Sequence, residues 1–435
     1  MTTDIRRPLW TTAAVIGALL SSAAVANAGG FAIREQSTQF LGTSFAGDAA
    51  GDGLSSMFWN PAALGQTTGL QSESNVAVIL PNTTIHALPG STLLGIGSPA
   101  DSGNIGINAA VPSSYYGYEI SRQVVVGLSI NAPFGLGTQP STGFWAGQTH
   151  TRNNDIRTYN FTPTIAYRVT PNFMIGAGVQ IEHMWGLLES ASGALPNSPN
   201  VSIEGKDTAL GFTLGALWMP TQAMSVGLGY RSSVSHTLDG TMSINALGFS
   251  NNIKAGLSTP ETVTASFRHR FNPQFTLLGT VEWAHWSRLD KLDIVCNAAG
   301  APFCAGGAGS LANSLPLNWH DGWFFALGGE YSWSPALTLR AGAAYEISPI
   351  QNPDERTPRL PDADRVWASI GAAYNYSEKL SFDFAYAHLF VKDSQIDRTQ
   401  SGVRLFGDVD SHVDILSVGM KYRWYTPPKA IITKG

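Results

Sequence analysis

The sequence is short of charge: Lys, Arg, Asp and Glu make up 13% of its 435 residues, about half of the roughly 25% usual in soluble domains. After residue 28 it also lacks any run of about 18 apolar residues, which excludes a protein held in a membrane by long helices. The formal net charge is -5 and basic residues do not cluster, which argues against nucleic acid as a partner. What is present is 46 glycines and 10% aromatic residues. This balance is typical of a β-barrel whose strands are apolar on one face only.

The sequence also lacks the motifs on which common enzymes depend. It contains no nucleophile elbow, no HExxH zinc motif, no phosphate-binding loop and no dinucleotide fingerprint, and its nine histidines are scattered. A lipase would need a serine, a histidine and an acid or amide brought together, and the spacing selects no such set. We therefore expect no enzymatic activity, no cofactor and no metal site.

Only two cysteines are present, Cys296 and Cys304. Two thiolates are too few ligands for a structural metal site. In an exported chain, which meets an oxidising periplasm, the pair favours a local disulfide that closes a small loop. Two free thiols are the alternative.

Residues 1–28 have the features of a secretory signal peptide. Arg6 and Arg7 give a positive start, a short apolar stretch follows, and Ala26-Asn27-Ala28 fits the small-x-small cleavage rule. The alternative is a membrane-anchoring helix, which the polar residues within the apolar stretch disfavour. We expect the mature chain to begin at Gly29.

From residue 67 onward, apolar residues recur at every second position, which is the period of a β-strand. In the segment FMIGAGVQIEHMWGL, for example, one face is apolar and the other carries Gly176, Gly178, Gln180 and Glu182. The polar face of these strands is mostly Gly, Ala, Ser and Thr, and the apolar face often begins or ends in Trp or Tyr, as in the aromatic girdles of membrane barrels. A soluble β-sandwich also alternates and is the alternative.

The connections between these strands alternate in length. Short turns occur near residues 120, 170, 220, 272, 335 and 377. Longer loops are expected at residues 87–109, 133–152, 189–202, 239–252, 293–317, 350–362 and 393–410. This alternation predicts an all-β fold: a transmembrane antiparallel β-barrel of about 14 strands over residues 67–424, with its short turns in the periplasm. Residues 425–435 would then form a C-terminal periplasmic tail.

Residues 29–66 show neither a strand period nor a helix period and are rich in Gly, Ala and Ser. A barrel of about 14 strands is wider than an eight-stranded one, whose interior side chains can fill it, so its lumen needs a plug. We predict that residues 29–66 form this N-terminal hatch. Asn60, Pro61 and Ala62 would fix the turn into the first strand, because proline fixes φ and lacks a backbone donor.

Two of the predicted loops are unusually apolar for exposed segments. Their prominent side chains are Leu195, Met242, Ile244, Leu247 and Phe249. They form either a landing groove for an apolar ligand or a local packing of the loops. The polar residues on the inner wall either pair with one another and with the hatch, or supply one basic group to a ligand carboxylate.

A proline interrupts the third strand at Asn131-Ala132-Pro133-Phe134-Gly135. Because proline cannot donate to a β-ladder, it belongs at an edge, a bulge or a strand end. We interpret Asn131, Pro133 and Gly135 as a kink that would loosen strand pairing and open the wall sideways. A simple strand end is the alternative.

Four segments together resemble the FadL/TodX family of outer-membrane transporters of long-chain fatty acids and other hydrophobic compounds. They are GGF after the signal peptide, NPAAL at the end of the hatch, APFGLGT, and PTIAYRVTPNFMIGAGVQI. The resemblance implies a barrel of fourteen strands with an N-terminal hatch, an outer ligand groove between loops, an inner pocket, and a lateral exit at the kinked third strand. By this resemblance Gly30 belongs to the hatch and Phe31 reaches the inner pocket.

We therefore expect passive uptake of long-chain fatty acids or related hydrophobic compounds. An uptake channel for aromatic hydrocarbons and a general diffusion porin are the alternatives. The partners would be the apolar ligand and outer-membrane lipid, with no nucleic acid, and the protein would act as a monomer. Its location would be the outer membrane of a Gram-negative bacterium.

Overall fold

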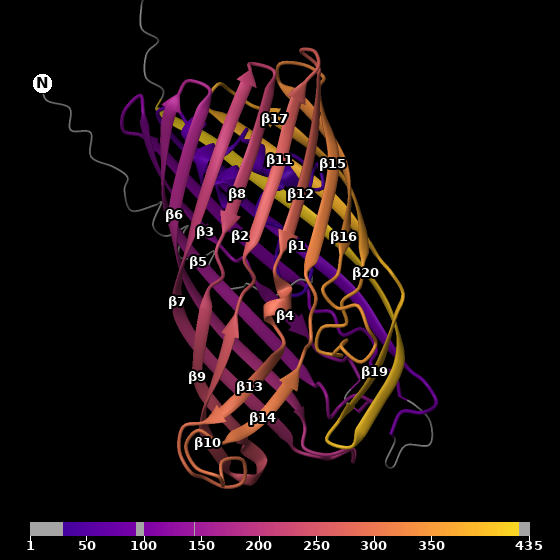
Figure 1. The fold of residues 1–435 in the computed structure, drawn as a ribbon. Helices are drawn as coiled ribbons and strands as arrows, with labels where there is room; N and C mark the ends of the chain where they lie inside the picture. The colour runs from indigo at the N-terminus through magenta and orange to yellow at the C-terminus, as the bar shows by residue number, and fades with distance from the viewer. Residues whose placement is uncertain (1–28, 93–99, 143, 426–435) are drawn as a thin grey trace, which may run out of the picture.

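The computed structural model describes residues 29–92, 100–142 and 144–425, which form a closed, tilted β-barrel (Figure 1). The predicted signal peptide lies outside the described residues, and so does the predicted tail beyond Tyr425. Within the described ranges, no helix is long and apolar enough to cross a membrane.

The barrel wall is made of twenty strand segments. The first ten are β1 (Leu70–Ala87), β2 (Ala109–Glu119), β3 (Val124–Asn131), β4 (Gly135–Thr138), β5 (Asn153–Thr170), β6 (Phe173–Ala191), β7 (Asn200–Thr221), β8 (Met224–Arg231), β9 (Ser235–Ile244) and β10 (Phe249–Ser258). The others are β11 (Thr262–Arg270), β12 (Phe275–Ala284), β13 (Lys291–Cys296), β14 (Leu311–Pro316), β15 (Gly322–Ser332), β16 (Leu337–Ile347), β17 (Arg365–Asn375), β18 (Leu380–Val391), β19 (Ser394–Gln400) and β20 (Val403–Tyr425).

These segments make up 14 barrel strands, because six of the strands are interrupted. β5 pairs with both β3 and β4, β7 pairs with both β8 and β9, and β20 pairs with both β18 and β19. The segments β10 with β11, β12 with β13, and β14 with β15 are joined in the same way. The barrel closes where β1 pairs antiparallel with β20. The predicted 14-stranded antiparallel barrel is thus confirmed.

The alternation of side chains follows the predicted faces. On β20 the outward residues Leu416, Val418 and Met420 are about half exposed, whereas Val413 and Ile415 face the interior and are buried. Exposed aromatic residues lie near the short turns, at positions such as Trp218, Trp333, Tyr376 and Trp424. An apolar outer band flanked by aromatic residues is what a barrel in a lipid bilayer requires.

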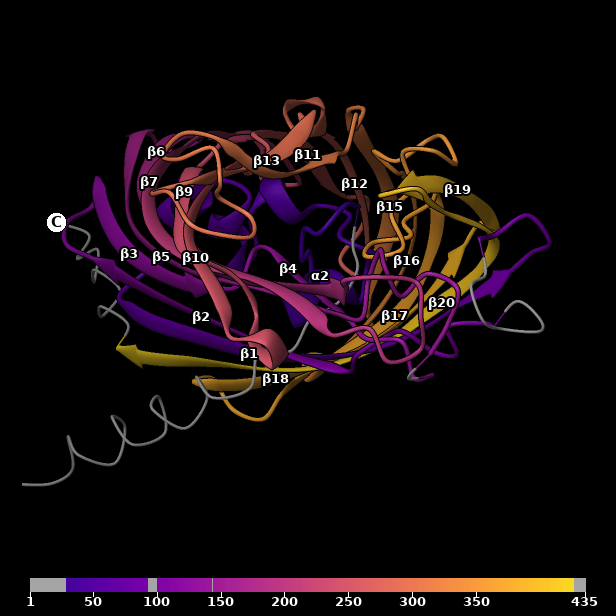
Figure 2. The ribbon, with the colours of Figure 1, turned by 90° about the horizontal axis from the view of Figure 1, so that it is seen from below.

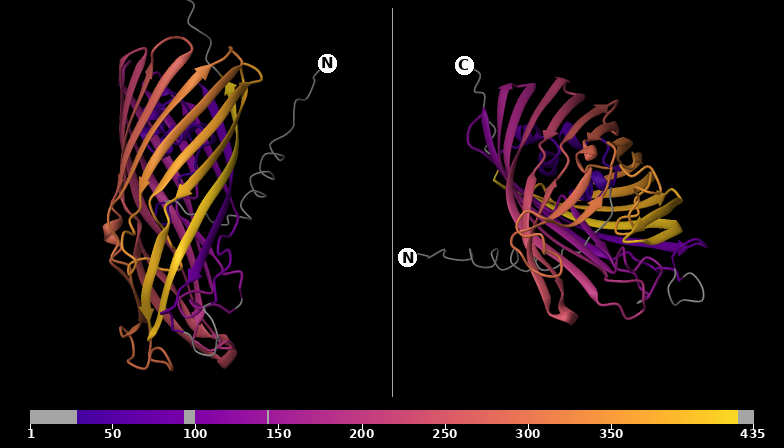
Figure 3. Two further views of the ribbon diagram at one scale, coloured as in Figure 1. Left: turned by 90° about the vertical axis from the view of Figure 1, so that its right-hand side faces the viewer. Right: turned by 60° about the horizontal axis from the view of Figure 1, so that its bottom comes forward.

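Two of the predicted loops, 239–252 and 393–410, are mostly strand, and a third, 189–202, is strand at both ends. Within 189–202, β6 continues to Ala191 and β7 already begins at Asn200; in 239–252 and 393–410 only short turns separate β9 from β10 and β19 from β20. The long β20 hairpin runs over the full height of the barrel (Figure 3). These strand ends lack the apolar face of the membrane band, so the period that predicted the other strands did not extend to them. Backbone pairing holds them instead.

The hatch lies inside the barrel, as the view along its axis shows (Figure 2). It contains four short helices: α2 (Thr38–Leu41), η1 (Asp48–Ala50), η2 (Leu54–Phe58) and η3 (Pro61–Gln66). Two further single turns, η4 (Asn245–Leu247) and η5 (Trp286–Arg288), belong to the wall. Residues 35–51 are all buried. Close approach depends on wall glycines: a Cβ at Gly229 would lie 1.8 Å from the carbonyl oxygen of Trp59.

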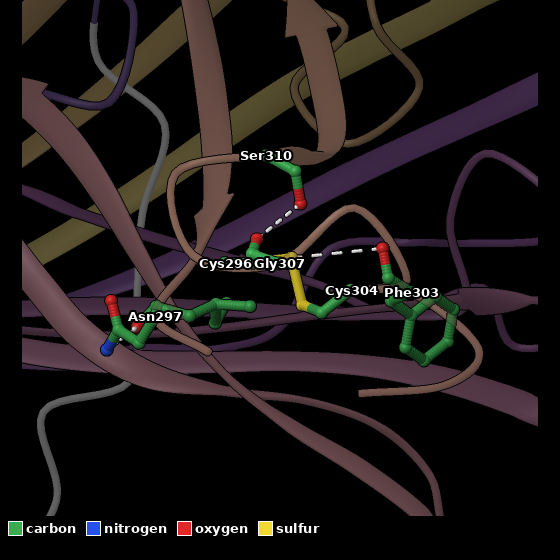
Figure 4. Close-up of a disulfide and its surroundings, with 7 residues drawn as sticks. Cys296, Asn297, Phe303, Cys304, Gly307 and Ser310 are labelled. Carbon is green, nitrogen blue, oxygen red and sulfur yellow. Dashed lines mark hydrogen bonds between the residues drawn. A yellow bond between two sulfur atoms is a disulfide. The ribbon is translucent and has the colours of Figure 1, made fainter. Parts of the chain in front are cut away.

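Cys296 and Cys304 are joined by a disulfide at the tip of the β13–β14 hairpin (Figure 4). The hairpin loop it closes is held further by a hydrogen bond of 2.7 Å that Ser310 Oγ donates to the carbonyl of Gly307. Both sulfurs are buried against Met242 and Ile294 in a small apolar cluster. The crosslink therefore orders one loop and lies outside the membrane-facing band.

We predict that Cys296→Ser/Cys304→Ser keeps an intact barrel but loosens this hairpin tip. A crosslink between residues eight apart lowers the conformational entropy of the unfolded loop and so stabilises the folded hairpin by about 2–3 kcal/mol. This stabilisation concerns the hairpin tip and not the barrel. Limited proteolysis should cut within residues 297–310 sooner, while the resistance of the unheated barrel to SDS stays as in the parent. Reduction of the parent protein is the matched control, and loss of barrel resistance in the variant would contradict this assignment.

Candidate functional site

The first residues of the hatch pair with the interrupted third strand. Ala32 forms an antiparallel bridge with Phe134. Ile33 N donates to the carbonyl of Pro133 at 2.8 Å, and Gly135 N donates to the carbonyl of Phe31 at 2.8 Å. The hatch backbone thus takes the place of a strand neighbour at the break between β3 and β4.

The wall is thinly paired at the same point. β2 pairs with β3 only up to Ser114 and Ile130, and the described ladder partner of β4 is β5. Gln36 of the hatch fills the space between them: its Nε2 donates to the carbonyl of Ala132 at 2.8 Å, and its Oε1 accepts from Asn131 Nδ2 at 3.1 Å. A side chain of the hatch therefore supplies the hydrogen bonds that a continuous strand pair would make.

Phe31 is buried in a cluster of aromatic rings. Its ring centroid lies 5.0 Å from that of Trp286, 5.7 Å from Phe134 and 6.0 Å from Trp319. The preceding Gly30 has φ +65°, and a Cβ there would lie 2.8 Å from the Trp286 ring. Only glycine combines this backbone conformation with this closeness, so the GGF sequence is explained by the aromatic cluster that it must enter.

A small cavity of about 70 Å³ lies beside this cluster. Its apolar walls come from the hatch, from the kink and from η5, and its polar groups belong to Arg34, Arg231, Glu282 and Glu346. The volume is well below the roughly 300–1,000 Å³ of ordinary small-molecule sites. An apolar ligand of useful size therefore fits only if the hatch or the wall moves.

Charged groups anchor the hatch to the wall. Arg34 of the hatch donates to Glu282 on β12 at 2.7 Å, lies 3.9 Å from Glu346 on β16, and stacks 3.8 Å over the ring of Phe324. Gly29 N donates to Glu346 and Gly30 N to Asp362, each at 3.0 Å. These ion pairs and hydrogen bonds hold the start of the hatch against the wall, directly beside the apolar cavity.

Two acidic residues of the hatch are buried in unusual surroundings. Among the described residues, neither carboxylate oxygen of Glu35 has a hydrogen-bond partner, and burial, aided by Glu346, raises its pKa to about 7. Burial, aided by Glu282, also raises the pKa of Asp48 to about 7. Asp48 Oδ1 accepts from Ser266 Oγ at 2.8 Å. Both carboxyls are therefore partly protonated near neutral pH.

On the side of the hatch that faces the short turns, ion pairs line an open vestibule of about 1250 Å³. Arg268 bridges Asp52 and Glu330, and Arg340 bridges Glu330 and Asp383. The prediction that inner wall residues pair with one another and with the hatch holds for this group. Its polar lining does not suit an apolar ligand.

Asn60, Pro61 and Ala62 begin η3 at the end of the hatch. Asn60 Oδ1 caps this helix by accepting from Ala62 N at 3.0 Å, and Pro61 occupies its first turn. The amide of Asn60 also donates to the carbonyls of Ala49, at 2.7 Å, and of Ala216 on β7, at 2.9 Å. One side chain thus joins two parts of the hatch to the wall.

The five loop residues predicted for ligand landing lie apart from the Phe31 cluster. Leu195, Leu247 and Phe249 are exposed at the hairpin tips. Met242 is buried beside the disulfide in a separate apolar cluster, and Ile244 is buried at the end of β9. The structure therefore brings Phe31 together with Asn131, Pro133 and Gly135, but not with the loop residues.

Sequence reasoning did not single out Phe134, Trp286, Trp319 or Phe324 as site residues. Phe134 follows Pro133 inside the predicted kink, and Trp286 lies in the turn that interrupts β12 and β13. An aromatic residue at a break in strand alternation is a signal that could have marked both. Trp319 and Phe324 reach the site from strands and loops remote in sequence, and no local pattern marks them.

Comparison with known proteins identifies the family. The family model described as outer membrane protein transport protein (OMPP1/FadL/TodX) matches residues 19–424. The chain belongs to this family. It is therefore an outer-membrane protein of a Gram-negative bacterium that transports hydrophobic compounds, and it is not an enzyme.

Individual relatives cover most of the chain. Outer membrane protein P1 of Haemophilus influenzae is 28% identical over 86% of this chain and 88% of its own length. A long-chain fatty acid transport protein of Escherichia coli is 25% identical over 88% of this chain and 92% of its own length.

Solved structures share the fold. A FadL homologue of Pseudomonas aeruginosa has a TM-score of 0.81 at 24% identity and covers 92% of this chain and 100% of its own. The toluene transporter TbuX of Ralstonia pickettii has a TM-score of 0.65 at 20% identity, covering 88% and 97%.

We predict that Arg34→Met loosens the docked hatch, because it leaves Glu282 buried without its cation, a change that costs about 3–5 kcal/mol. A cysteine placed at the buried hatch position Ser44 should then react faster with a maleimide. Adding Glu282→Gln should slow the reaction again, since the uncompensated charge is removed. Arg404→Met, which breaks an exposed ion pair with Asp397, is the matched control, and equal labelling of the Arg34 variant and its parent would contradict the anchoring role.

Proposed function

We propose that this protein mediates passive uptake of long-chain fatty acids across the outer membrane. The ligand lands on the exposed loop residues Leu195, Leu247 and Phe249, with Met242 and Ile244 beneath them. It then moves to the cavity beside Phe31, the hatch shifts, and the ligand leaves sideways into outer-membrane lipid at Asn131, Pro133 and Gly135. The protein acts as a monomer in this scheme.

The observation that carries the fatty-acid assignment is Arg231. Its guanidinium lines the apolar cavity, lies 4.5 Å over the ring of Phe58, and is 8% exposed. It makes no side-chain hydrogen bond or ion pair with any residue the structure describes, and its Nη2 is fully buried. A buried cation without a partner is costly. A fatty-acid carboxylate would supply the charge-assisted hydrogen bonds that Arg231 lacks.

The coupling between hatch and wall supports the lateral exit. Ala32, Ile33 and Gln36 make the backbone and side-chain bonds that close the wall near the kink. A ligand that displaces Phe31 from its aromatic cluster would therefore also weaken these bonds. Enlargement of the cavity and opening of the wall would then be one movement of residues 31–36.

Aromatic hydrocarbons are the second candidate. The rings of Phe134, Trp286 and Phe324 around the cavity would suit a flat apolar ligand, and the toluene transporter TbuX shares the fold. A neutral hydrocarbon would nonetheless leave Arg231 unpaired. A general diffusion porin is disfavoured because the buried hatch occupies the lumen that such a pore would keep open to water.

We predict that labelled oleate enters cells lacking their own transporter faster when this protein is supplied. Arg231→Met should reduce oleate uptake about tenfold, the effect of losing a hydrogen bond to a charged group, and Phe31→Ala should also reduce it. Labelled toluene should respond to Phe31→Ala but not to Arg231→Met.

Arg404→Met is the matched control for removal of an arginine. Uptake of toluene alone would move the assignment to hydrocarbons. If neither compound enters faster while the protein is folded in the outer membrane, the porin becomes the hypothesis to test.

Hatch movement can be tested by locking the hatch to the wall. Ser44 Oγ lies 2.7 Å from Ser369 Oγ on β17, so Ser44→Cys/Ser369→Cys places two sulfurs within bonding reach. We expect the oxidised variant to lose oleate uptake and to regain it on reduction. The single variants and the reduced parent are controls, and normal uptake by the locked protein would refute the mechanism.

A further inference from the structure

Glu35 lies within residues 31–36, the segment of the hatch that moves in the proposed function. It is 2% exposed, and its neighbours Arg34 and Gln36 are bound to the wall by side-chain hydrogen bonds. Neither carboxylate oxygen of Glu35 has a hydrogen-bond partner among the described residues. Glu35 is also not among the residues that line the cavity beside Phe31. The proposed function therefore gives this buried acid no role.

The cations nearest to Glu35 are paired with other carboxylates. Arg34 of the hatch bonds Glu282 at 2.7 Å, and Arg365 on β17 bonds Asp362. Glu35 itself makes no ion pair with a residue that the structure describes. A buried carboxylate that has neither donors nor a counter-ion is strongly disfavoured in its charged form. It can stay buried at low cost only by holding a proton.

The charged groups around Glu35 agree with this conclusion. Glu346 on β16 lies 3.9 Å from Arg34 and 3.6 Å from Arg365, so it draws on the same two cations. Burial raises the pKa of Glu35 from its ordinary 4.5 to about 7, and the like charge of Glu346 adds to the effect. The backbone N–H of Glu35, Arg34 and Arg365 act in the opposite direction and do not outweigh burial. Below pH 7 the docked hatch therefore holds Glu35 mainly as a neutral acid.

Asp48 is a second buried acid of the hatch, but it lies outside residues 31–36. Its Oδ1 accepts from Ser266 Oγ at 2.8 Å and from Thr280 Oγ1 at 3.1 Å, whereas Oδ2 has no partner among the described residues. The backbone on both sides of Asp48 also donates to these two hydroxyls. The charged groups that act on Asp48 are Glu282 on β12 and Arg34. Asp48 thus provides a buried acid, held to β11 and β12, against which Glu35 can be compared.

We propose that Glu35 is a proton-release group of the hatch, neutral while residues 31–36 are docked and ionised when a ligand displaces them. On displacement the carboxyl O–H bond breaks, the proton passes to water or a buffer base, and the carboxylate becomes hydrated. This inference rests on the proposed function, because it assumes that the ligand moves residues 31–36. Ligand binding would then depend on pH even for a ligand that carries no charge.

The direction of the pH dependence follows from which state binds the proton. Between the ordinary pKa of 4.5 and about 7, the docked hatch binds one more proton at Glu35 than the displaced hatch. The docked state has its full stability below this interval, loses stability as the pH rises through it, and changes no further above it. The affinity for a neutral ligand should therefore rise by up to about tenfold per pH unit within the interval and level off above it.

The test is calorimetric binding of 1-hexadecanol, which has no ionisable group in this pH range, to the purified full-length protein in detergent at about pH 6. Titrations in buffers of different ionisation enthalpy give the number of protons released per ligand bound. The parent protein should release about one proton, and Glu35→Gln about none. Asp48→Asn, which removes the other buried acid, is the matched control and should release as many protons as the parent.

Binding without proton release by the parent protein overturns the inference and leaves the proposed function standing, and so does equal release by Glu35→Gln. Should the substitutions prevent folding, infrared spectra of the parent protein test the same point. The C=O band of a neutral carboxylic acid should be present at about pH 6 and weaken when 1-hexadecanol, which has no carbonyl group, binds. An unchanged band overturns the inference. Failure of the parent protein to bind or transport oleate overturns the proposed function and this inference with it.

Discussion

The interior of a 14-stranded barrel is too wide for its own inward side chains to fill, and this width governs the rest of the structure. The hatch occupies that space, and it can do so only where the wall presents almost no side chain. Gly229 and Gly371 let hatch backbone lie against wall backbone. These wall glycines therefore serve close contact between two layers of backbone.

Charge inside the barrel is arranged in two different ways. On the short-turn side of the hatch, Arg268, Arg340 and their acidic partners neutralise one another. On the loop side of the hatch and beside it, Arg231, Arg359 and Arg398 are buried, and no carboxylate among the residues described lies within ion-pair distance of them. Where the charged side chains form ion pairs with one another, those pairs hold the hatch and the wall together. Where arginines lack an ion-pair partner, binding of an anion stabilises the protein. This asymmetry along the barrel axis supports the proposed uptake of a fatty acid.

The sequence predicted the barrel well because its main signal is local. Alternation places Leu416, Val418 and Met420 on one face, and short turns rich in Pro, Asn and Ser mark the strand ends. The strand extensions around Val201 and Ser243 escaped prediction because they lie beyond the apolar band and lack a one-sided pattern. For the site, Gly30, Phe31 and the Pro133 region could be anticipated from motifs. Trp319, Phe324 and Arg231 come together from distant strands, and only closure of the barrel determines that they meet.

One contact of the hatch bears on how the protein is made. The N–H of Gly29 donates to Glu346 deep in the lumen, and a Cβ at this residue would lie 2.5 Å from the same carboxylate. With cleavage after Ala28, this nitrogen becomes the charged amino terminus of the mature chain, and Glu346 becomes its counter-ion. Under the predicted cleavage, removal of the leader would create the ion pair that seats the hatch, and processing would then come before closure of the barrel around its own amino terminus.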